Sequence, residues 1–178
     1  MAQLELARCY RDLANWAKAK EAYAIINSNL MNEIVAAEFA ETIYLNGDVK
    51  EAIEYLQNTS TRYRQSAQRL QLLLADIYLN CGELEKATEL TERLVSEEDY
   101  DGDYFLGAMS LLVRMQSVTG INESLENKLL RRLRLSTSDL AESVELHFTM
   151  AKFYDNAQRF SEAEKYYIEA NALKKRGI

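Results

Sequence analysis

An alanine recurs along this chain at intervals of 33 and 35 residues, at Ala19, Ala52 and Ala87. Nine positions before each of these alanines stands a large residue, and three positions before the large residue stands a second alanine. The chain of 178 residues contains no proline, which is the residue that interrupts helices most strongly. A fixed period of this length in a chain without proline predicts stacked pairs of helices.

The clearest copy of the pattern lies near the end of the chain, where Ala151, Tyr154 and Ala163 have the same spacing. In the earlier copies the first alanine and the large residue are Ala7 and Tyr10, Ala40 and Ile43, and Ala75 and Tyr78. The four repeats cover about 1–31, 34–62, 68–98 and 144–175.

The spacing has a physical reason. A small residue in the first helix of a pair allows the second helix to approach closely, and the later alanine lies at that contact. Enlarging such an alanine should strain the contact by about 1–3 kcal/mol. A single pair cannot bury its own apolar face, so neighbouring pairs must stack.

Glycine stands between the two helices of a pair at Gly47 and Gly82. Many helices end with a residue in the left-handed conformation, which glycine adopts without steric cost. The first and last copies have Ala14 and Gln158 at this position. We therefore expect the turns of these two copies to be looser.

The interval between Ala87 and Ala163 is about two periods long, so it has room for one more repeat. Apolar residues in 104–118 and 123–135 are spaced as on two amphipathic helices. We interpret 103–136 as a degenerate pair. The chain should therefore be all-α, with ten helices in five antiparallel pairs that form a single domain over 1–178.

A unit of about 34 residues with this pattern resembles the tetratricopeptide repeat. None of the copies carries the proline that often closes the family's repeat. The resemblance implies a right-handed α-solenoid in which the first helices of the pairs line a concave face. Ligand peptides commonly bind to that face in this family.

We expect the outward-facing residues of the first helices to form the binding face, although an ordinary solvated surface is the alternative. The candidates are Arg8, Arg11, Glu41, Tyr44, Asp76, Leu79, Asn80, Lys152 and Asp155. The same face should also present Asp12, Ala37, Leu45, Leu72, Phe148 and Asn156.

One branch of the family binds a C-terminal carboxylate through Lys, Asn and Arg side chains of successive first helices. The corresponding positions in the second and third repeats hold Ala37, Glu41, Leu72 and Asp76. Two carboxylates would repel the ligand carboxylate, so the sequence argues against such a clamp.

Other conspicuous residues favour structural roles. The basic residues Lys128, Arg131, Arg132 and Arg134 could meet an anionic partner, but the polar face of an amphipathic helix is the favoured interpretation. His147 lies where the family places a bulky packing residue. Cys9 and Cys81 have no spacing that fits a metal site.

Composition excludes several classes of function. The formal net charge is −7, which argues against a nucleic-acid partner. No apolar run reaches the roughly 18 residues of a membrane span, and two cysteines favour a reducing, cytoplasmic location. No catalytic motif appears, so we expect neither catalysis nor a cofactor or metal.

The segment 144–175 carries a second resemblance, through Glu145–Phe148, Met150–Lys152, Tyr154–Asp155, Tyr166 and Ala170–Lys174. It is similar to the last repeat of bacterial proteins that fuse tetratricopeptide repeats to a sulfotransferase domain. This resemblance implies a catalytic domain C-terminal to the repeats in the same polypeptide.

Three hypotheses of function follow. The leading one is a non-catalytic protein-interaction scaffold that binds a peptide or a partner domain through the concave face. The alternative is an accessory domain that positions the acceptor substrate of a sulfotransferase. The third is weak self-association, because the first and last pairs leave apolar helix faces uncovered.

Overall fold

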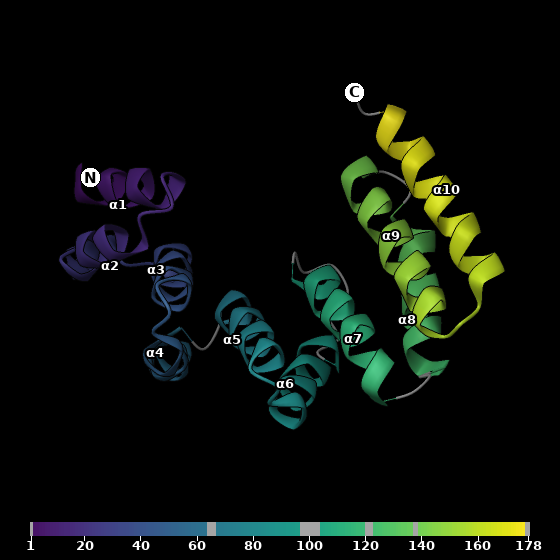
Figure 1. Ribbon diagram of the computed structural model, residues 1–178, viewed down its shortest axis with the longest axis horizontal. Helices are drawn as coiled ribbons and strands as arrows, with labels where there is room; N and C mark the ends of the chain where they lie inside the picture. Colours follow the sequence, from purple (N-terminus) through teal and green to yellow (C-terminus); the bar gives the residue numbers. More distant parts are fainter. Residues whose placement is uncertain (1, 64–66, 97–103, 120–122, 137–138, 177–178) are drawn as a thin grey trace. The chain divides into compact units, whose positions relative to one another are not determined.

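The computed structural model describes residues 2–63, 67–96, 104–119, 123–136 and 139–176. Within these ranges the chain forms ten α-helices and one short 3₁₀ helix, and no strand (Figure 1). The prediction of an all-α fold built from helix pairs is confirmed. The predicted repeat limits at 98 and 103 lie outside the described residues.

The helices follow one another as short pairs in the predicted order. They are α1 (Ala2–Asp12), α2 (Trp16–Ala24), η1 (Ser28–Leu30), α3 (Glu33–Leu45), α4 (Val49–Arg62), α5 (Gln68–Asn80), α6 (Leu84–Ser96), α7 (Phe105–Thr119), α8 (Glu123–Leu135), α9 (Leu140–Asn156) and α10 (Phe160–Arg176).

Helix α9 begins at Leu140, four residues before the predicted start of the last repeat. The cause is an N-cap, since the Asp139 carboxylate accepts hydrogen bonds from the backbone N–H groups of Ala141 and Glu142 at 2.9 and 3.1 Å. A side-chain acceptor at this position satisfies the donors that the first helical turn leaves unpaired.

The chain divides into two compact units, Met1–Leu90 and Thr91–Ile178. In the first unit α1 packs on α2, α2 on α3, and α3 and α4 on α5. In the second unit α9 packs on α7, α8 and α10. That the five pairs form one continuous domain stays a prediction.

The repeating alanines are buried, as the close approach of the paired helices requires. Each is no more than 3% exposed, and they are Ala7, Ala19, Ala40, Ala52, Ala75, Ala87, Ala151 and Ala163. The large residue of the pattern is buried at Ile43, Tyr78 and Tyr154 and half-buried at Tyr10. The prediction of a core built at these positions is confirmed.

Aromatic rings pack against one another across neighbouring helices, both between pairs and within a pair. In the first unit the Phe39 ring stacks on Tyr23 of α2, with centroids 5.7 Å apart, and meets the edge of Tyr55 of α4 at 5.0 Å. In the second unit Tyr154 of α9 stacks on Tyr166 of α10 at 5.4 Å. These tyrosines therefore act mainly as packing residues.

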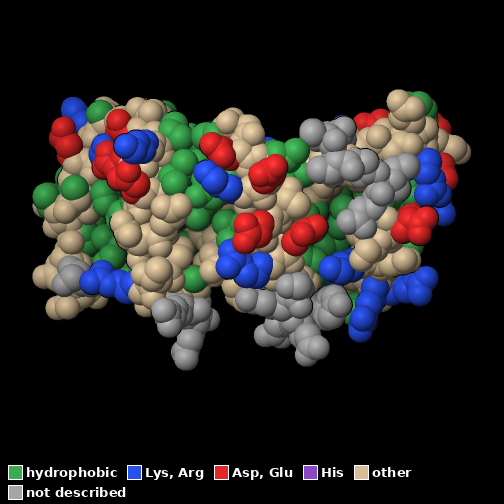
Figure 2. Space-filling view, turned by 90° about the horizontal axis from the view of Figure 1, so that it is seen from below, with side chains coloured by type: hydrophobic (Ala, Val, Ile, Leu, Met, Phe, Trp, Pro, Cys, Tyr) green, Lys and Arg blue, Asp and Glu red, His purple; other side chains and the backbone are tan. Residues whose placement is uncertain are grey.

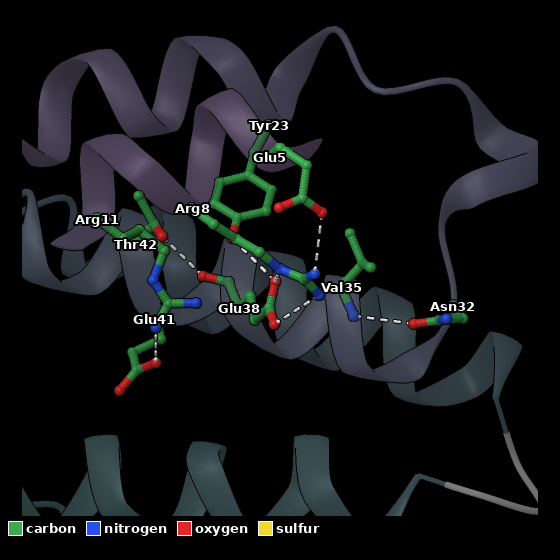
Figure 3. A network of polar contacts seen from close by, with 9 residues as sticks. All are labelled: Glu5, Arg8, Arg11, Tyr23, Asn32, Val35, Glu38, Glu41 and Thr42. Carbon is green, nitrogen blue, oxygen red and sulfur yellow. Dashed lines mark hydrogen bonds and ion pairs between the residues drawn. The ribbon is translucent and has the colours of Figure 1, made fainter. Parts of the chain in front are cut away.

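Charged side chains connect the first pair of helices to the second. Arg8 of α1 donates from Nε and Nη2 to the two carboxylate oxygens of Glu38 of α3, at 3.1 and 3.0 Å. The Tyr23 hydroxyl of α2 donates to the same carboxylate at 2.9 Å (Figure 3). Burial raises the pKa of Tyr23, so this hydroxyl remains a hydrogen-bond donor at neutral pH.

Two further cations of the first pair have carboxylate partners on the second. Arg11 Nη2 donates to Glu41 Oε2 at 2.5 Å (Figure 3). Lys20 Nζ contacts Asp48 Oδ2 at 2.6 Å and Glu51 Oε2 at 2.7 Å, and its hydrogen bond lowers the pKa of Asp48.

We call this set of contacts the junction network. All of its cations lie on the first pair and all of its carboxylates on the second. It consists of Arg8, Arg11, Lys20, Tyr23, Glu38, Glu41, Asp48 and Glu51.

Four turns within helix pairs have the same backbone geometry, whether or not they contain glycine. The second residue after each first helix has a positive φ, +94° at Gly47, +79° at Gly82, +52° at Ala14 and +58° at Gln158. Its N–H donates to the carbonyl three residues earlier, and the next N–H donates to the carbonyl five residues earlier.

The expectation of looser turns at Ala14 and Gln158 is therefore wrong. Their hydrogen bonds are 2.8–3.0 Å long, compared with 2.9–3.2 Å in the glycine turns. A residue with a Cβ atom is disfavoured in the left-handed region by a steric clash. The same turn thus forms at both kinds of position, but it carries backbone strain in the first and last pairs.

We predict that Ala14→Gly and Gln158→Gly each stabilise the protein by about 0.5–1 kcal/mol, because relief of left-handed strain outweighs the added entropy of the unfolded chain. Gly47→Ala should destabilise by a similar amount. A Cβ at Gly47 would meet nothing within 4 Å, so this effect comes from the backbone alone. Urea unfolding measures all three, and a Gly47→Ala variant as stable as the parent would contradict the account.

We predict that Glu38→Gln lowers the free energy of unfolding by about 1–2 kcal/mol, because Arg8 loses a charged bidentate acceptor in a half-buried site. Glu54→Gln is the matched control, since its partner Lys50 is 3.9 Å away and 92% exposed. The control should change stability by less than about 0.5 kcal/mol. Equal urea midpoints for the two variants would show that the junction network contributes little.

Candidate functional site

All nine predicted binding residues lie within the described parts of the chain, but they belong to two units. Arg8, Arg11, Glu41, Tyr44, Asp76, Leu79 and Asn80 lie in the first unit, and Lys152 and Asp155 lie in the second. Asn80 and Lys152 are exposed, and the other residues of the set are half-buried. Each member of the set therefore keeps some surface that a partner could contact.

Two further residues expected on the binding face have structural positions instead. Ala37 is only 5% exposed, so it packs inside its repeat and cannot contact a partner. Asn156 donates from Nδ2 to the carbonyl oxygen of Val113 at 2.8 Å. Its side chain therefore connects α9 to α7.

Arg8 and Arg11 already have carboxylate partners in the junction network. A shallow hollow of about 380 Å³ adjoins them, lined by Arg8, Arg11, Asp12, Trp16 and Glu38. Its two guanidinium groups are balanced by two carboxylates. An anionic ligand would have to compete with Glu38 and Glu41, so this hollow has no strong preference for either charge.

Asp76 and Asn80 contact each other one helical turn apart on α5, with Asn80 Nδ2 donating to Asp76 Oδ2 at 3.3 Å. Lys152 and Asp155 form a similar local contact on α9, at 3.0 Å. Neither of these two contacts joins separate elements. In both contacts the side chains lie at the surface, where a partner could reach them.

The second unit contains a groove of about 440 Å³, which we call the α7/α9 groove. Its apolar lining comes from Val113, Ala141, Val144 and Phe148, and its hydroxyl groups come from Ser110 and Thr149. The charged residues that line it are Arg114, Glu145, Lys152 and Lys174.

The walls of this groove are held by contacts between helices. Arg132 of α8 donates from Nε to Glu142 Oε1 of α9 at 2.5 Å. The Arg132 guanidinium also lies 5.9 Å from the ring centroid of Phe105 of α7. Arg132 thus acts within the fold, as the favoured interpretation of the basic run on α8 expects.

A second cluster fixes the opposite end of α9. The Tyr154 hydroxyl donates to Glu126 Oε1 of α8 at 2.7 Å, and Arg159 Nη1 donates to the same oxygen at 3.1 Å. The guanidinium of Arg159 lies 4.6 Å from the Tyr154 ring centroid. Burial, reinforced by Glu126, raises the pKa of Tyr154, so this residue stays protonated and keeps donating.

His147 has the contacts of a packing residue. Its Nδ1 lies 2.6 Å from the carbonyl oxygen of Ser143, and its ring centroid lies 6.0 Å from that of Tyr166. Its Nε2 lies 3.5 Å from Glu169 Oε2. The side chain is 13% exposed, which agrees with the structural role expected for it.

Neither a metal site nor a membrane-spanning helix is found among the described residues. Among them there is no cluster of three or more His, Cys, Asp or Glu side chains that could hold a metal ion. None of the described helices is long and apolar enough to cross a membrane. On the face shown in Figure 2, acidic and basic side chains are interspersed among apolar and other groups.

Sequence reasoning found Phe148 and Lys152 of the α7/α9 groove but missed Arg114 and Lys174. Arg114 lies in the degenerate repeat, where no alanine pattern marks the binding face. Lys174 lies in the last turn of α10, where a cation interacts favourably with the helix dipole whether or not it binds a ligand. Only the packing of α10 against α9 shows that this cation also lines the groove.

Two family models that describe tetratricopeptide repeats match the chain, at residues 44–112 and at residues 1–29. No curated protein matches it. The matched family models carry no sulfotransferase description. The second resemblance therefore stays a prediction.

Solved structures resemble nearly the whole chain. One structure of the TPR-like repeats of a putative kinesin light chain from Podosopora anserina is 22% identical, with 99% of this chain and 94% of that chain covered and a TM-score of 0.76. A structure of the MamA protein is 14% identical, with 98% and 91% covered and a TM-score of 0.64. At these identities the likeness shows the fold alone. The chain therefore carries tetratricopeptide repeats and has the fold of a TPR-like α-solenoid.

Proposed function

We propose that this chain is a non-catalytic protein-interaction module that binds a segment of a partner protein in the α7/α9 groove. The observation that carries the proposal is the groove itself, which combines an apolar floor with a hydroxyl and charged rim. Its volume of about 440 Å³ falls within the usual range of ligand sites, about 300–1,000 Å³.

The floor of the groove can supply the binding energy. Val144 and Phe148 are half-buried in the free chain and Ala141 is exposed, so an apolar side chain of the partner would remove their remaining surface from water. Such burial contributes about 25 cal/mol to the binding free energy for each Å² of apolar surface removed from water. Because contacts with α8 and α10 already hold α9 in place, little ordering is needed when a partner binds.

The other predicted face residues form a second part of the proposal. Glu41, Tyr44, Asp76, Leu79 and Asn80 lie on the first helices of the second and third pairs. They are partly or fully exposed, and we propose that a longer peptide or a partner domain contacts them as well.

The accessory role in a sulfotransferase remains a second hypothesis from the sequence of the last repeat. The coding sequence beyond Ile178 tests it. A cytoplasmic location is likewise proposed, and the exposed, free thiols of Cys9 and Cys81 suit a reducing compartment.

Weak self-association is a further hypothesis. Leu13 and Ile25 in the first pair, and Phe160 and Ile168 in the last, are 61–76% exposed. Sedimentation at two concentrations tests whether such faces associate, and an unchanged monomer mass would reject the hypothesis.

We predict that Ala141→Trp weakens peptide binding by about tenfold or more, which is about 1.4 kcal/mol. Ala141 is exposed and lines the groove, so the indole fills the binding space without disturbing the core. Peptides are selected from a random linear library displayed on phage against the whole chain. Their affinities for parent and variant are then measured by fluorescence anisotropy.

Ala172→Trp is the control, because Ala172 is exposed on α10 but does not line the groove. The affinity of this variant for the selected peptides should stay within about twofold of the parent value. This corresponds to a change in binding free energy well under about 1 kcal/mol. Circular dichroism melting of both variants verifies that they are folded. Selected peptides that bind Ala141→Trp as tightly as the parent, or a selection that yields no binding peptide, would refute the proposed site.

A further inference from the structure

The α7/α9 groove is positively charged on a chain that is acidic as a whole. Among the described residues, three cations, Arg114, Lys152 and Lys174, line it together with a single carboxylate, Glu145. The whole chain has a formal net charge of −7. The groove is therefore a local exception to the charge of the protein.

Lys174 and Lys152 lie toward the two ends of the apolar floor. The ring pairs of His147 with Tyr166 and of Phe148 with Tyr167 join the middle of α9 to the middle of α10. The two helices are consecutive and antiparallel, so this register places Lys174, in the last turn of α10, beside the first turns of α9. Lys152 lies eleven residues beyond Ala141 on α9, which is about 16 Å along the helix axis.

Lys174 and Lys152 can both turn toward a ligand. Lys174 is exposed, and it lines the groove from the last turn of its helix. Lys152 contacts Asp155 at 3.0 Å, but the two side chains are 51% and 39% exposed. An exposed ion pair of this kind contributes little to stability, so releasing Lys152 has a small cost.

The part of α9 between these cations presents an apolar row to the groove, with the carboxylate of Glu145 beside it. Ala141, Val144 and Phe148 are spaced by three and four residues, so they lie on one side of the helix. Lys152 continues the same row, one turn beyond Phe148. A matching ligand therefore needs an apolar side chain in the middle and negative charge on either side.

We propose that the partner segment bound in the α7/α9 groove is acidic, with carboxylates on both sides of an apolar anchor residue. This inference rests on the proposed function of the groove and names the chemistry of its partner. Phe148 and Val144 would contact the anchor, whereas Lys152 and Lys174 would contact the carboxylates. Complementary charge of this kind raises the association rate and selects among partners.

The peptides selected from the phage library provide the first test. Those that Ala141→Trp blocks should carry a net negative charge, with an aliphatic or aromatic residue between acidic ones. Their affinity for the parent chain should fall as salt is raised, because exposed charges are screened. A set of groove-dependent peptides that is neutral or basic would overturn the inference and leave the proposed function standing.

Charge reversal provides the second test. The double variant Lys152→Glu and Lys174→Glu should bind the acidic peptides at least about tenfold more weakly than the parent. Lys175→Glu is the matched control, since Lys175 is the next residue on α10 and does not line the groove. It should bind within about twofold of the parent.

A neutral double variant, Lys152→Gln and Lys174→Gln, separates loss of charge from loss of folding, and it should bind with intermediate affinity. The inference would be overturned if the charge-reversed double variant and the Lys175→Glu control bound the acidic peptides with equal affinity. Peptides that bind all variants equally, Ala141→Trp included, would instead refute the proposed function itself.

Discussion

The burial of two alanines in each of the four helix pairs that carry the repeat pattern is the constraint on which the rest of the structure depends. Because Ala7 and its counterparts have almost no exposed surface, the backbones of paired helices must lie near each other. The residue one turn further along then fills the space beside the contact. This geometry fixes the interval between the two alanines, and with it the length of the turn that joins the helices.

Apolar contact alone does not determine which pair follows which, because every pair presents similar small and aromatic residues. The junction network supplies that information for the first two pairs. Arg8, Arg11 and Lys20 on one side match Glu38, Glu41, Asp48 and Glu51 on the other. A half-buried bidentate pair such as Arg8 with Glu38 is sensitive to geometry, so a different neighbouring pair would leave these charges without partners.

The fold could be predicted from the sequence because its rules are local. The alanine spacing and the glycines at Gly47 and Gly82 act within one pair, and they placed the helices to within a few residues. The groove could not be predicted in the same way, since Arg114, Phe148 and Lys174 lie on three helices that meet only after packing. A regular signal did exist for the junction network, because Arg8 and Arg11 each precede a glutamate by thirty residues.

The position of Lys174 in the last turn of α10 has a thermodynamic consequence. Terminal turns of helices fray, and each time this turn unwinds, the groove loses a positive charge at one end. Capture of an anion there and winding of the turn are therefore linked equilibria, and each favours the other. The last turn of α10 would be most ordered when a ligand fills the groove. Binding in the groove would therefore be accompanied by a local loss of mobility at this end of the helix.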